Sequence, residues 1–407
     1  MAPLRSFLKS GHTPTLLAAF LYFDFCFAVW VLNGAMAPFI SETYQLSAAQ
    51  KGFMISVPIL AGALMRFPLG VLAQYIGRKN AAMVEMALIM AARALGFFFT
   101  RGYDHVIPMG VLRAIAGPSL GVALSRGSGW FPPQHKGLAM GIAGAGNSGT
   151  VLAVLFAPPL AQAYGWQTVY GLAGACMLLP FIVMALYAKE PPDHARQSLR
   201  QHVACLFERD GWAFSLLYVV TFGGFIGLVS FLPTYFHDQF GVTKVQAGQL
   251  TMLAAVMGSV VRVFGGYLGD RFGGVNTLTG VLILVAATLV ACGLAQASLT
   301  ASTLLFMLCF AALGAGNGAL FQLVPLRWPL ATAVAGSMIG EVGALGGALV
   351  PNAMGLSRQY LGSYLWGFIA LALLALAMLT VLRLMQGRWT TTWAAQGGRA
   401  RVATARA

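Results

Sequence analysis

Twelve apolar runs, each long enough to cross a lipid bilayer, follow one another along almost the whole chain. A membrane-spanning α-helix needs roughly 20 apolar residues to cross about 30 Å of hydrocarbon. The composition, 58% hydrophobic and 9% charged residues, excludes a soluble globular domain. We therefore predict an all-α integral membrane protein with 12 transmembrane helices in the lipid bilayer. They lie at residues 15–40, 51–73, 81–100, 105–129, 138–162, 166–188, 212–236, 246–269, 277–296, 301–325, 332–356 and 361–386.

The positions of the basic residues predict how the chain is oriented in the membrane. The net charge is +14. With a cytoplasmic N-terminus, sixteen basic residues face the cytoplasm and only four face outward, namely Lys51, Arg101, Lys244 and Arg358. Cytoplasmic loops of membrane proteins are enriched in lysine and arginine. We therefore expect both termini in the cytoplasm and a location in the inner (plasma) membrane, and the charge requires no nucleic acid partner.

The cysteines and histidines form no pattern typical of a metal site or a catalytic site. Four of the five cysteines lie in apolar runs, which is typical of small core residues. The six histidines all lie in loops or at the ends of runs. The sequence therefore predicts neither an enzyme nor a bound metal or cofactor.

An arginine occurs in the middle of two apolar runs, and the two segments repeat each other. The segment RFPLGVLAQYIGRK begins at Arg66, and RVFGGYLGDRFGG begins at Arg262, 196 positions later. A guanidinium at bilayer depth costs on the order of 2.5–3.5 kcal/mol, so each arginine needs a reason. The repeat predicts two pseudo-symmetric six-helix bundles, residues 1–188 and 212–387. A linker loop, 189–211, joins them, and a basic cytoplasmic tail, 388–407, follows.

The loop after each arginine run is similar to a pattern of the major facilitator superfamily, G-x-L-x-D-R-x-G-R/K. The second copy, GYLGDRFGG, is close to it, and the first, GVLAQYIGRK, has Gln74 where the acid is usual. The resemblance implies the major facilitator fold and a role for these loops in conformational change. The residues concerned are Gly70, Gly77, Arg78, Gly266, Asp270, Arg271 and Gly273.

Two of the predicted helices are rich in glycine, at residues 137–161 and 336–355. Glycines three or four positions apart share a helix face and let backbones approach closely. Such stripes serve helix packing, and the close approach also exposes backbone groups to a small ligand. Both interpretations stay open for Gly144, Gly146 and the neutral amide of Asn147.

The segments GAGNSG (144–149) and GAGNGALFQLVP (314–325), together with the paired arginines, resemble the nitrate/nitrite porter family of that superfamily. Further similar stretches are VWVLNGAMAPFI (29–40), PILAGALMRFPLG (58–70), WFPPQHKGLAMG (130–141) and YVVTFGGFIG (218–227). The resemblance implies an anion held between Arg66 and Arg262. It also implies an aromatic pair at Tyr218 and Phe222, which ordinary packing would explain equally well.

The chemistry of the arginines agrees with that resemblance. Nitrate is small, planar and monovalent, and a guanidinium donates two parallel hydrogen bonds in one plane. One arginine from each half would hold the anion at the bilayer midplane, and each half could rock around it.

Other charged residues within the predicted helices suggest how transport is coupled. Asp24 is expected to pair with Arg113, either as a structural ion pair or as part of proton coupling. Glu341 has no evident partner in the sequence, so we expect it to carry a proton. Glu85, near the start of its helix, is expected to belong to a cytoplasmic charge network.

Energetics favours proton-coupled uptake of nitrate. Nitrate takes no proton, and moving it inward against 100 mV costs about 2.3 kcal/mol per charge. We therefore predict a monomeric secondary transporter that imports nitrate, or nitrite, with protons by alternating access. The alternatives are a nitrate/nitrite exchanger and a porter for another small organic anion. A channel is disfavoured because it does not require two halves that rock about a central charge.

Overall fold

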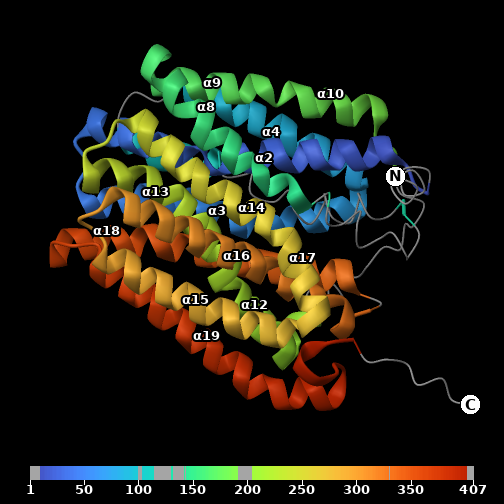
Figure 1. Ribbon diagram of the computed structural model, residues 1–407. Coiled ribbons are helices and arrows are strands. Elements are labelled where there is room, and N and C mark those ends of the chain that lie inside the picture. Colours follow the sequence, from blue (N-terminus) through green and yellow to red (C-terminus); the bar gives the residue numbers. More distant parts are fainter. Residues whose placement is uncertain are drawn as a thin grey trace, which may run out of the picture.

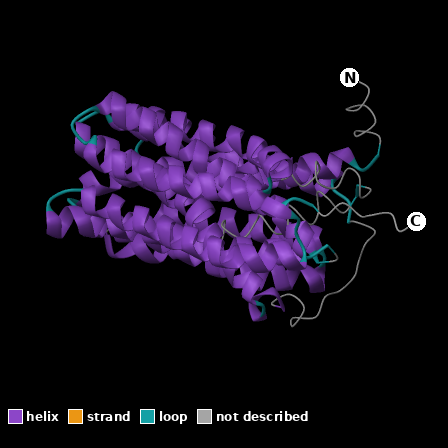
Figure 2. Ribbon diagram, turned by 60° about the horizontal axis from the view of Figure 1, so that its bottom comes forward, coloured by secondary structure: helices purple, strands orange, loops and turns teal. Residues whose placement is uncertain are grey.

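The computed structural model describes residues 10–99, 103–113, 130–131, 142, 144–190, 204–329 and 331–400. Every regular element in these ranges is helical, and the long helices run side by side (Figures 1 and 2). The first half contains α2 (Thr13–Tyr44), α3 (Ala48–Ile76), α4 (Arg78–Phe99), α5 (Tyr103–Arg113), η2 (Ala145–Ser148), α8 (Gly149–Tyr164), α9 (Trp166–Cys176) and α10 (Leu178–Tyr187). The second half contains η3 (Ala204–Phe207), α12 (Arg209–Tyr218), η4 (Val219–Gly223), α13 (Gly224–Phe240), α14 (Lys244–Phe272), α15 (Gly274–Leu294), α16 (Leu299–Arg327), α17 (Thr332–Leu345), η5 (Gly346–Ala348), α18 (Leu349–Leu361), α19 (Leu365–Thr392) and η6 (Gln396–Gly398).

The described helices account for ten of the predicted membrane spans. Ten helical segments in this part of the chain are long and apolar enough to cross a bilayer. α9 with α10, α12 with η4 and α13, and α17 with η5 and α18 each form one such segment. The predicted spans at 105–129 and 138–162 lie partly outside the described residues, which include α5 and α8 from these regions. The all-α membrane fold is confirmed.

The helix boundaries repeat at the interval that the sequence predicts. α2 and the continuous helix α12–α13 begin 196 positions apart and also end 196 positions apart, as do α3 and α14. Ser47 with Gln50, and Thr243 with Gln246, form capping boxes at the starts of α3 and α14. These boxes satisfy backbone N–H groups of the first helical turn. The same local signals therefore build the same unit in both halves.

The two halves meet along helices near the centre of the molecule. The spans formed by α2 and by α12–α13 are largely buried. Across the boundary, α2 packs on α13, α3 packs on α17 and α18, and α8 packs on α14. Glycines allow this approach: a side chain at Gly34 would meet the backbone of Ser230, and one at Gly52 would meet the carbonyl of Pro351. The boundary therefore brings backbone against backbone.

One end of this boundary is held by two ion pairs. We call it the distal end, because it lies opposite the start of α2 and the end of α19 (Figure 1). Lys51 on α3 pairs with Asp238 on α13 at 2.5 Å, and Lys244 on α14 pairs with Glu42 on α2. Each pair joins one half to the other, so the halves are in contact at the distal end.

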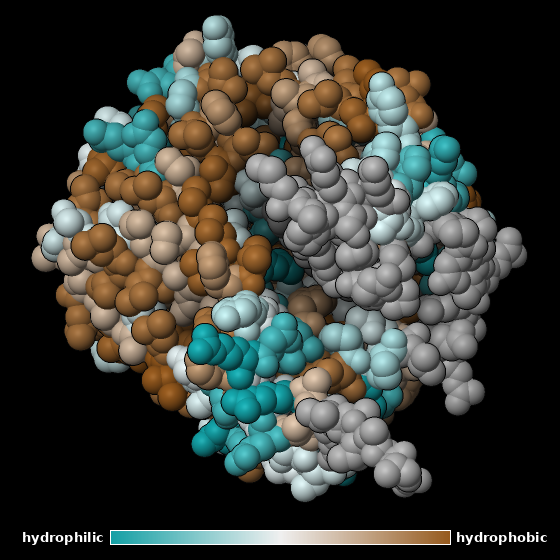
Figure 3. Space-filling view, turned by 45° about the vertical axis from the view of Figure 1, so that its right-hand side comes forward, coloured by the Kyte–Doolittle hydropathy of each residue, from teal (hydrophilic) through white to brown (hydrophobic). Residues whose placement is uncertain are grey.

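The opposite end is hollowed. A view toward this end shows a recess near the middle of the face, with hydrophilic residues inside it (Figure 3). The surface above and to the left of the recess in this view is largely hydrophobic, whereas hydrophilic residues gather below it (Figure 3). Exposed apolar side chains such as Leu284 on α15 and Leu384 on α19 are expected where helices face lipid.

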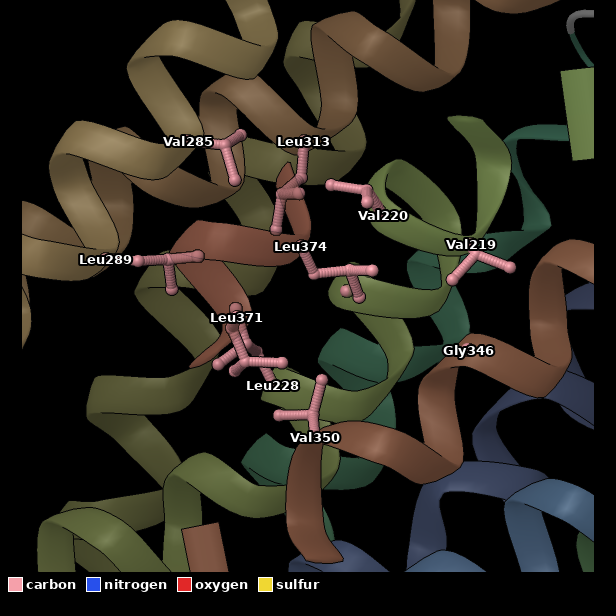
Figure 4. A pocket seen from close by; sticks show the side chains of 11 residues that line it. Val219, Val220, Leu228, Val285, Leu289, Leu313, Gly346, Val350, Leu371 and Leu374 are labelled. Carbon is pink, nitrogen blue, oxygen red and sulfur yellow. The ribbon is translucent and has the colours of Figure 1, made fainter. Parts of the chain in front are cut away.

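A separate apolar cavity lies beside η4 in the second half (Figure 4). Aliphatic side chains and two glycines form its walls, so it offers no hydrogen bond to an anion. The lining residues are Val219, Val220, Gly224, Leu228, Val285, Leu289, Leu313, Gly346, Val350, Leu371 and Leu374.

The last long helix continues past residue 387, where the sequence predicts the second bundle to end. α19 ends at Thr392. Trp389 near its end is fully buried, and its ring lies 4.9 Å from that of Phe214 on α12. The Trp389 indole N–H donates to Asp210 at 3.0 Å. These contacts extend the helix because they bury its final turns against the second half.

Candidate functional site

Arg66 lies in the middle of α3 and is 3% exposed. Its Nη1 donates a hydrogen bond of 3.0 Å to the backbone carbonyl of Gly340 on α17. Its guanidinium carbon lies 4.9 Å from the centre of the Trp30 ring and 5.5 Å from that of Phe222. Aromatic faces attract a guanidinium through their quadrupole. Trp30 belongs to the first half and the other two residues to the second, so Arg66 contacts both halves.

Arg262 occupies the equivalent position on α14 and is half-buried. Its guanidinium carbon lies 5.9 Å from the centre of the Phe321 ring on α16. Its Nη1 is buried and has no hydrogen-bond partner among the described residues. A buried donor of this kind is costly unless a water or a ligand accepts its hydrogen bond. Arg262 therefore has a donor available for an anion.

Three aromatic rings connect the two arginines. Tyr218 and Phe222 stack with their ring centres 4.8 Å apart and their planes at 8°. Tyr218 also meets Phe321 edge to face at 5.3 Å. The π-helical turn η4 (Val219–Gly223) begins directly after Tyr218 and includes Phe222. The contacts run from Arg66 through Phe222, Tyr218 and Phe321 to Arg262, and the charges of both arginines act on Tyr218.

The glycine stripe on α17 packs against these rings. A side chain at Gly343 would collide with the Tyr218 ring, and one at Gly336 would come within 3.1 Å of Phe321. Gly340, between them, supplies the carbonyl that accepts from Arg66. The stripe therefore packs the aromatic rings and also leaves a backbone oxygen accessible to the arginine.

Three residues predicted to belong to the site, Gly144, Gly146 and Asn147, lie in or next to η2. This short helix packs against both α2 and α14. Gly144 and Gly146 are buried, and a side chain at Gly146 would come within 2.8 Å of the backbone nitrogen of Asp24. Asn147 is 1% exposed, and neither atom of its amide has a hydrogen-bond partner among the described residues. Packing explains the glycines, whereas the amide is available to water or a ligand.

Asp24 has a different described partner from the one that the sequence predicts. The Ser148 hydroxyl donates to Asp24 Oδ1 at 2.6 Å, and the backbone N–H of Gly149 also donates to this carboxyl. The side chain of Arg113, its predicted partner, lies outside the described residues. Asp24 therefore joins α2 to the start of α8.

The expectation that Glu341 lacks a partner is wrong. Ser337, one turn earlier on α17, donates to Glu341 Oε1 at 3.1 Å. Glu341 is 6% exposed, and its charge acts on Arg66. The sequence does not reveal that Arg66 is near Glu341, because Arg66 comes from a helix of the other half.

The expectation for Glu85 is also wrong. Glu85 is 0% exposed and accepts a hydrogen bond from the Tyr22 hydroxyl on α2. The cation whose charge acts on it is Arg66 rather than a cytoplasmic residue. Glu85 lies two turns after the start of α4, and its side chain is buried in the interior of the first half.

The predicted loop motifs lie at the ends of α3 and α14. Gly77 and Gly273 have φ of 86° and 92°, which favour glycine. Asp270 and Arg271 are exposed, and Arg271 lies over Phe272 at 5.4 Å. Gly70 and Gly266 are half-buried one turn beyond the two arginines, and Arg78 begins α4.

Glu190, which follows α10, contacts the first of these loops, and its position in the sequence does not predict this contact. Its carboxylate accepts from the backbone N–H of Lys79 at 2.5 Å. It therefore supplies an acid at the start of α4, in the copy that has Gln74 in the usual acidic position.

Residues 18–357 match the family model of the Major Facilitator Superfamily. The chain belongs to the major facilitator superfamily. The fold prediction is therefore confirmed by both the family model and the helices. The site described above lies within the matched residues.

Curated relatives of this superfamily member have names that mention nitrate or nitrite. The "Nitrite extrusion protein" of Bacillus subtilis is 27% identical, with 86% of this chain and 89% of the relative covered. The "Probable nitrate/nitrite antiporter NarK1" of Thermus thermophilus is 28% identical, with 90% and 91% covered. The "Probable nitrate transporter NarT" of Staphylococcus aureus is 28% identical, with 93% and 97% covered.

Solved structures agree with the fold. The xylose transporter XylE from E. coli, in a partially occluded inward-open conformation, has a TM-score of 0.74 at 14% identity, with 93% of this chain and 98% of that chain covered. An inward-facing bacterial homologue of the human lysosomal transporter Spinster has a TM-score of 0.72 at 20% identity, with 91% and 95% covered.

Proposed function

We propose that this protein imports nitrate, and also accepts nitrite, by alternating access. The observation that carries the proposal is the pair of pseudo-equivalent arginines joined by the Phe222, Tyr218 and Phe321 rings. The names of the relatives and the resemblance of the glycine-rich segments support the same substrate.

The proposed binding site holds the anion between Arg66 and Arg262. Each guanidinium donates to oxygens in the plane of the ion, and the flat rings beside them suit a planar guest. The Tyr218 hydroxyl and the Asn147 amide supply neutral donors, while Gly144 and Gly146 let η2 approach. Close ring packing disfavours a bulky organic anion, which is the same-fold alternative.

The proposed orientation places the distal end outside the cell and both termini in the cytoplasm, in the inner (plasma) membrane. In this orientation the two distal ion pairs close the outer side and the recess opens inward. The halves, residues 1–188 and 212–387, rock about the arginines, and one copy of the chain acts as a monomer. The loop motifs around Gly77 and Gly273, at the ends of α3 and α14, control how closely the two halves approach each other on the inner side.

Proton entry is the proposed driving force. Inward movement of one anion against 100 mV costs about 2.3 kcal/mol, and one proton removes that cost. Glu341 is the proposed coupling acid, because it lies beside Arg66 and is nearly buried. Asp24 with Arg113 remains a second candidate, although Asp24 has donors from Ser148 and Gly149.

Exchange of nitrate for nitrite is the alternative, and the word "antiporter" in the name of one relative favours it. A single assay separates the two. Reconstituted protein is given nitrate outside under an inward pH gradient, with or without nitrite inside. Proton-coupled uptake proceeds with empty liposomes and acidifies them, whereas exchange needs the internal anion.

The test of the substrate uses counterflow at equal pH. Labelled nitrate is expected to accumulate in exchange for internal nitrate or nitrite, but not for chloride or formate. Glu341→Gln is expected to retain this counterflow and to lose pH-driven uptake, because a neutral amide mimics the protonated acid. Efficient exchange for formate would contradict the nitrate assignment.

A further inference from the structure

Glu85 on α4 is a buried acid to which the proposed transport cycle gives no role. Its side chain is 0% exposed. The Tyr22 hydroxyl donates to its Oε2, and its Oε1 is buried with no hydrogen-bond partner in the described residues. A buried carboxylate with a single donor is costly to keep charged unless a cation acts on it.

Arg66 supplies that positive charge. α4, which carries Glu85, packs on α3, which carries Arg66, and the charge of Arg66 acts on the carboxyl. α9 and α10, which pack on α4, carry no charged side chain. The acid therefore depends on the same guanidinium that the proposed function assigns to the anion.

The remaining neighbours do not replace Arg66. On α4 itself, Arg93 lies two turns further and donates to the carbonyl of Val29 at 2.7 Å. On α5, His105 is exposed, and the side chains of Asp104 and Arg113 lie outside the described residues.

We propose that Glu85 is a proton-binding site coupled to the anion site through Arg66, with Tyr22 as its positioning residue. Before nitrate binds, the positive charge of Arg66 stabilises the carboxylate. Bound nitrate neutralises that charge, so Glu85 takes up a proton from the outer side. When nitrate leaves to the cytoplasm, the Arg66 charge acts again and the proton leaves on the same side.

This site rests on the proposed function and deepens it. Glu341 approaches Arg66 from the second half, whereas Glu85 is linked to it within the first. Anion binding at one guanidinium is therefore coupled to acids in both halves, and Glu85 contributes its own share of the protons that accompany nitrate.

The test measures proton uptake when sodium nitrate is added to purified full-length protein in weakly buffered detergent solution. Wild type is expected to take up protons. Glu85→Gln keeps an acceptor for Tyr22 but cannot ionise, so its uptake per bound nitrate should fall by about half or more. Its nitrate counterflow at equal pH should stay within about twofold of wild type. Glu190→Gln, the same chemical change at a carboxyl that contacts the start of α4, should leave proton uptake per bound nitrate unchanged.

Wild-type proton uptake by a folded Glu85→Gln variant overturns the Glu85 site and leaves nitrate transport standing. A wild type that takes up no protons overturns this site together with proton coupling. If Glu85→Gln does not fold, Tyr22→Phe decides the question. It keeps the carboxyl but removes its donor, so the pH midpoint of nitrate-linked proton uptake should rise; an unchanged midpoint overturns the proposal.

Discussion

Arg66 and Arg262 occupy equivalent positions in two copies of one unit, yet their surroundings differ. Arg66 is nearly buried, donates to the Gly340 carbonyl of the other half and lies between Trp30 and Phe222. Arg262 is half-buried and lies beside Phe321 of its own half. The first is held in place by contacts from both halves, whereas the ring contact of the second comes from its own half.

We propose that this difference lets the symmetric pair perform two tasks. Contacts from both halves fix the Arg66 guanidinium before an anion arrives, which lowers the entropy cost of binding. Rearrangement of the boundary must change those contacts, so Arg66 also senses the conformation. The described ring contact of Arg262 comes from its own half, so its charge can stay in the site when the halves move.

The largest expected effect comes from replacing either arginine by lysine. Arg66→Lys and Arg262→Lys keep the charge but lose the planar fork, so nitrate counterflow should fall by about tenfold or more in each. Arg66→Lys should also lower the thermal unfolding midpoint, because a lysine cannot keep both the Gly340 hydrogen bond and the ring contacts. The loss in unfolding free energy is about 1–3 kcal/mol.

Arg262→Lys should leave the unfolding midpoint close to that of wild type. Unfolding followed by intrinsic fluorescence, beside counterflow rates, separates the two effects. Equal destabilisation by both substitutions would contradict the difference between the sites.

A smaller effect is expected where the first half packs near the arginines. Gly146→Leu puts its side chain against Asp24 and Phe23 on α2, so η2 must move away. Overpacking of this kind costs about 1–3 kcal/mol. Uptake should fall several-fold, as checked by initial rates. Gly280→Leu is the matched control, because no atom lies within 4 Å of a side chain added there. Wild-type rates in both variants would exclude a role for the contact between Gly146 and α2.

The spans and the repeat were predictable because both are local properties of the sequence. Hydropathy locates each helix, and the capping boxes at Ser47 and Thr243 recur at the repeat interval. The same interval identified Arg66 and Arg262. Trp30 and Phe321 lie within segments that carry the family resemblance, but hydropathy does not tell which of their faces meets a guanidinium.

The acids could not be placed from the sequence, because their neighbours come from other helices. Glu341 is adjacent in sequence to Gly340, yet Arg66 reaches that turn from α3. Glu85 is seven positions after the start of α4, which suggested the membrane surface, whereas the contact with Tyr22 of α2 places it inside. Tertiary packing decides both positions.

Equilibrium binding of nitrate to purified protein at fixed pH tests the central claim most directly. Titration calorimetry on wild type, Arg66→Lys and Arg262→Lys measures anion affinity without transport or a proton gradient. We expect saturable binding by wild type and a loss of about tenfold or more, 1.4 kcal/mol, in each variant. Wild-type affinity in either folded lysine variant would contradict an anion site formed by both arginines.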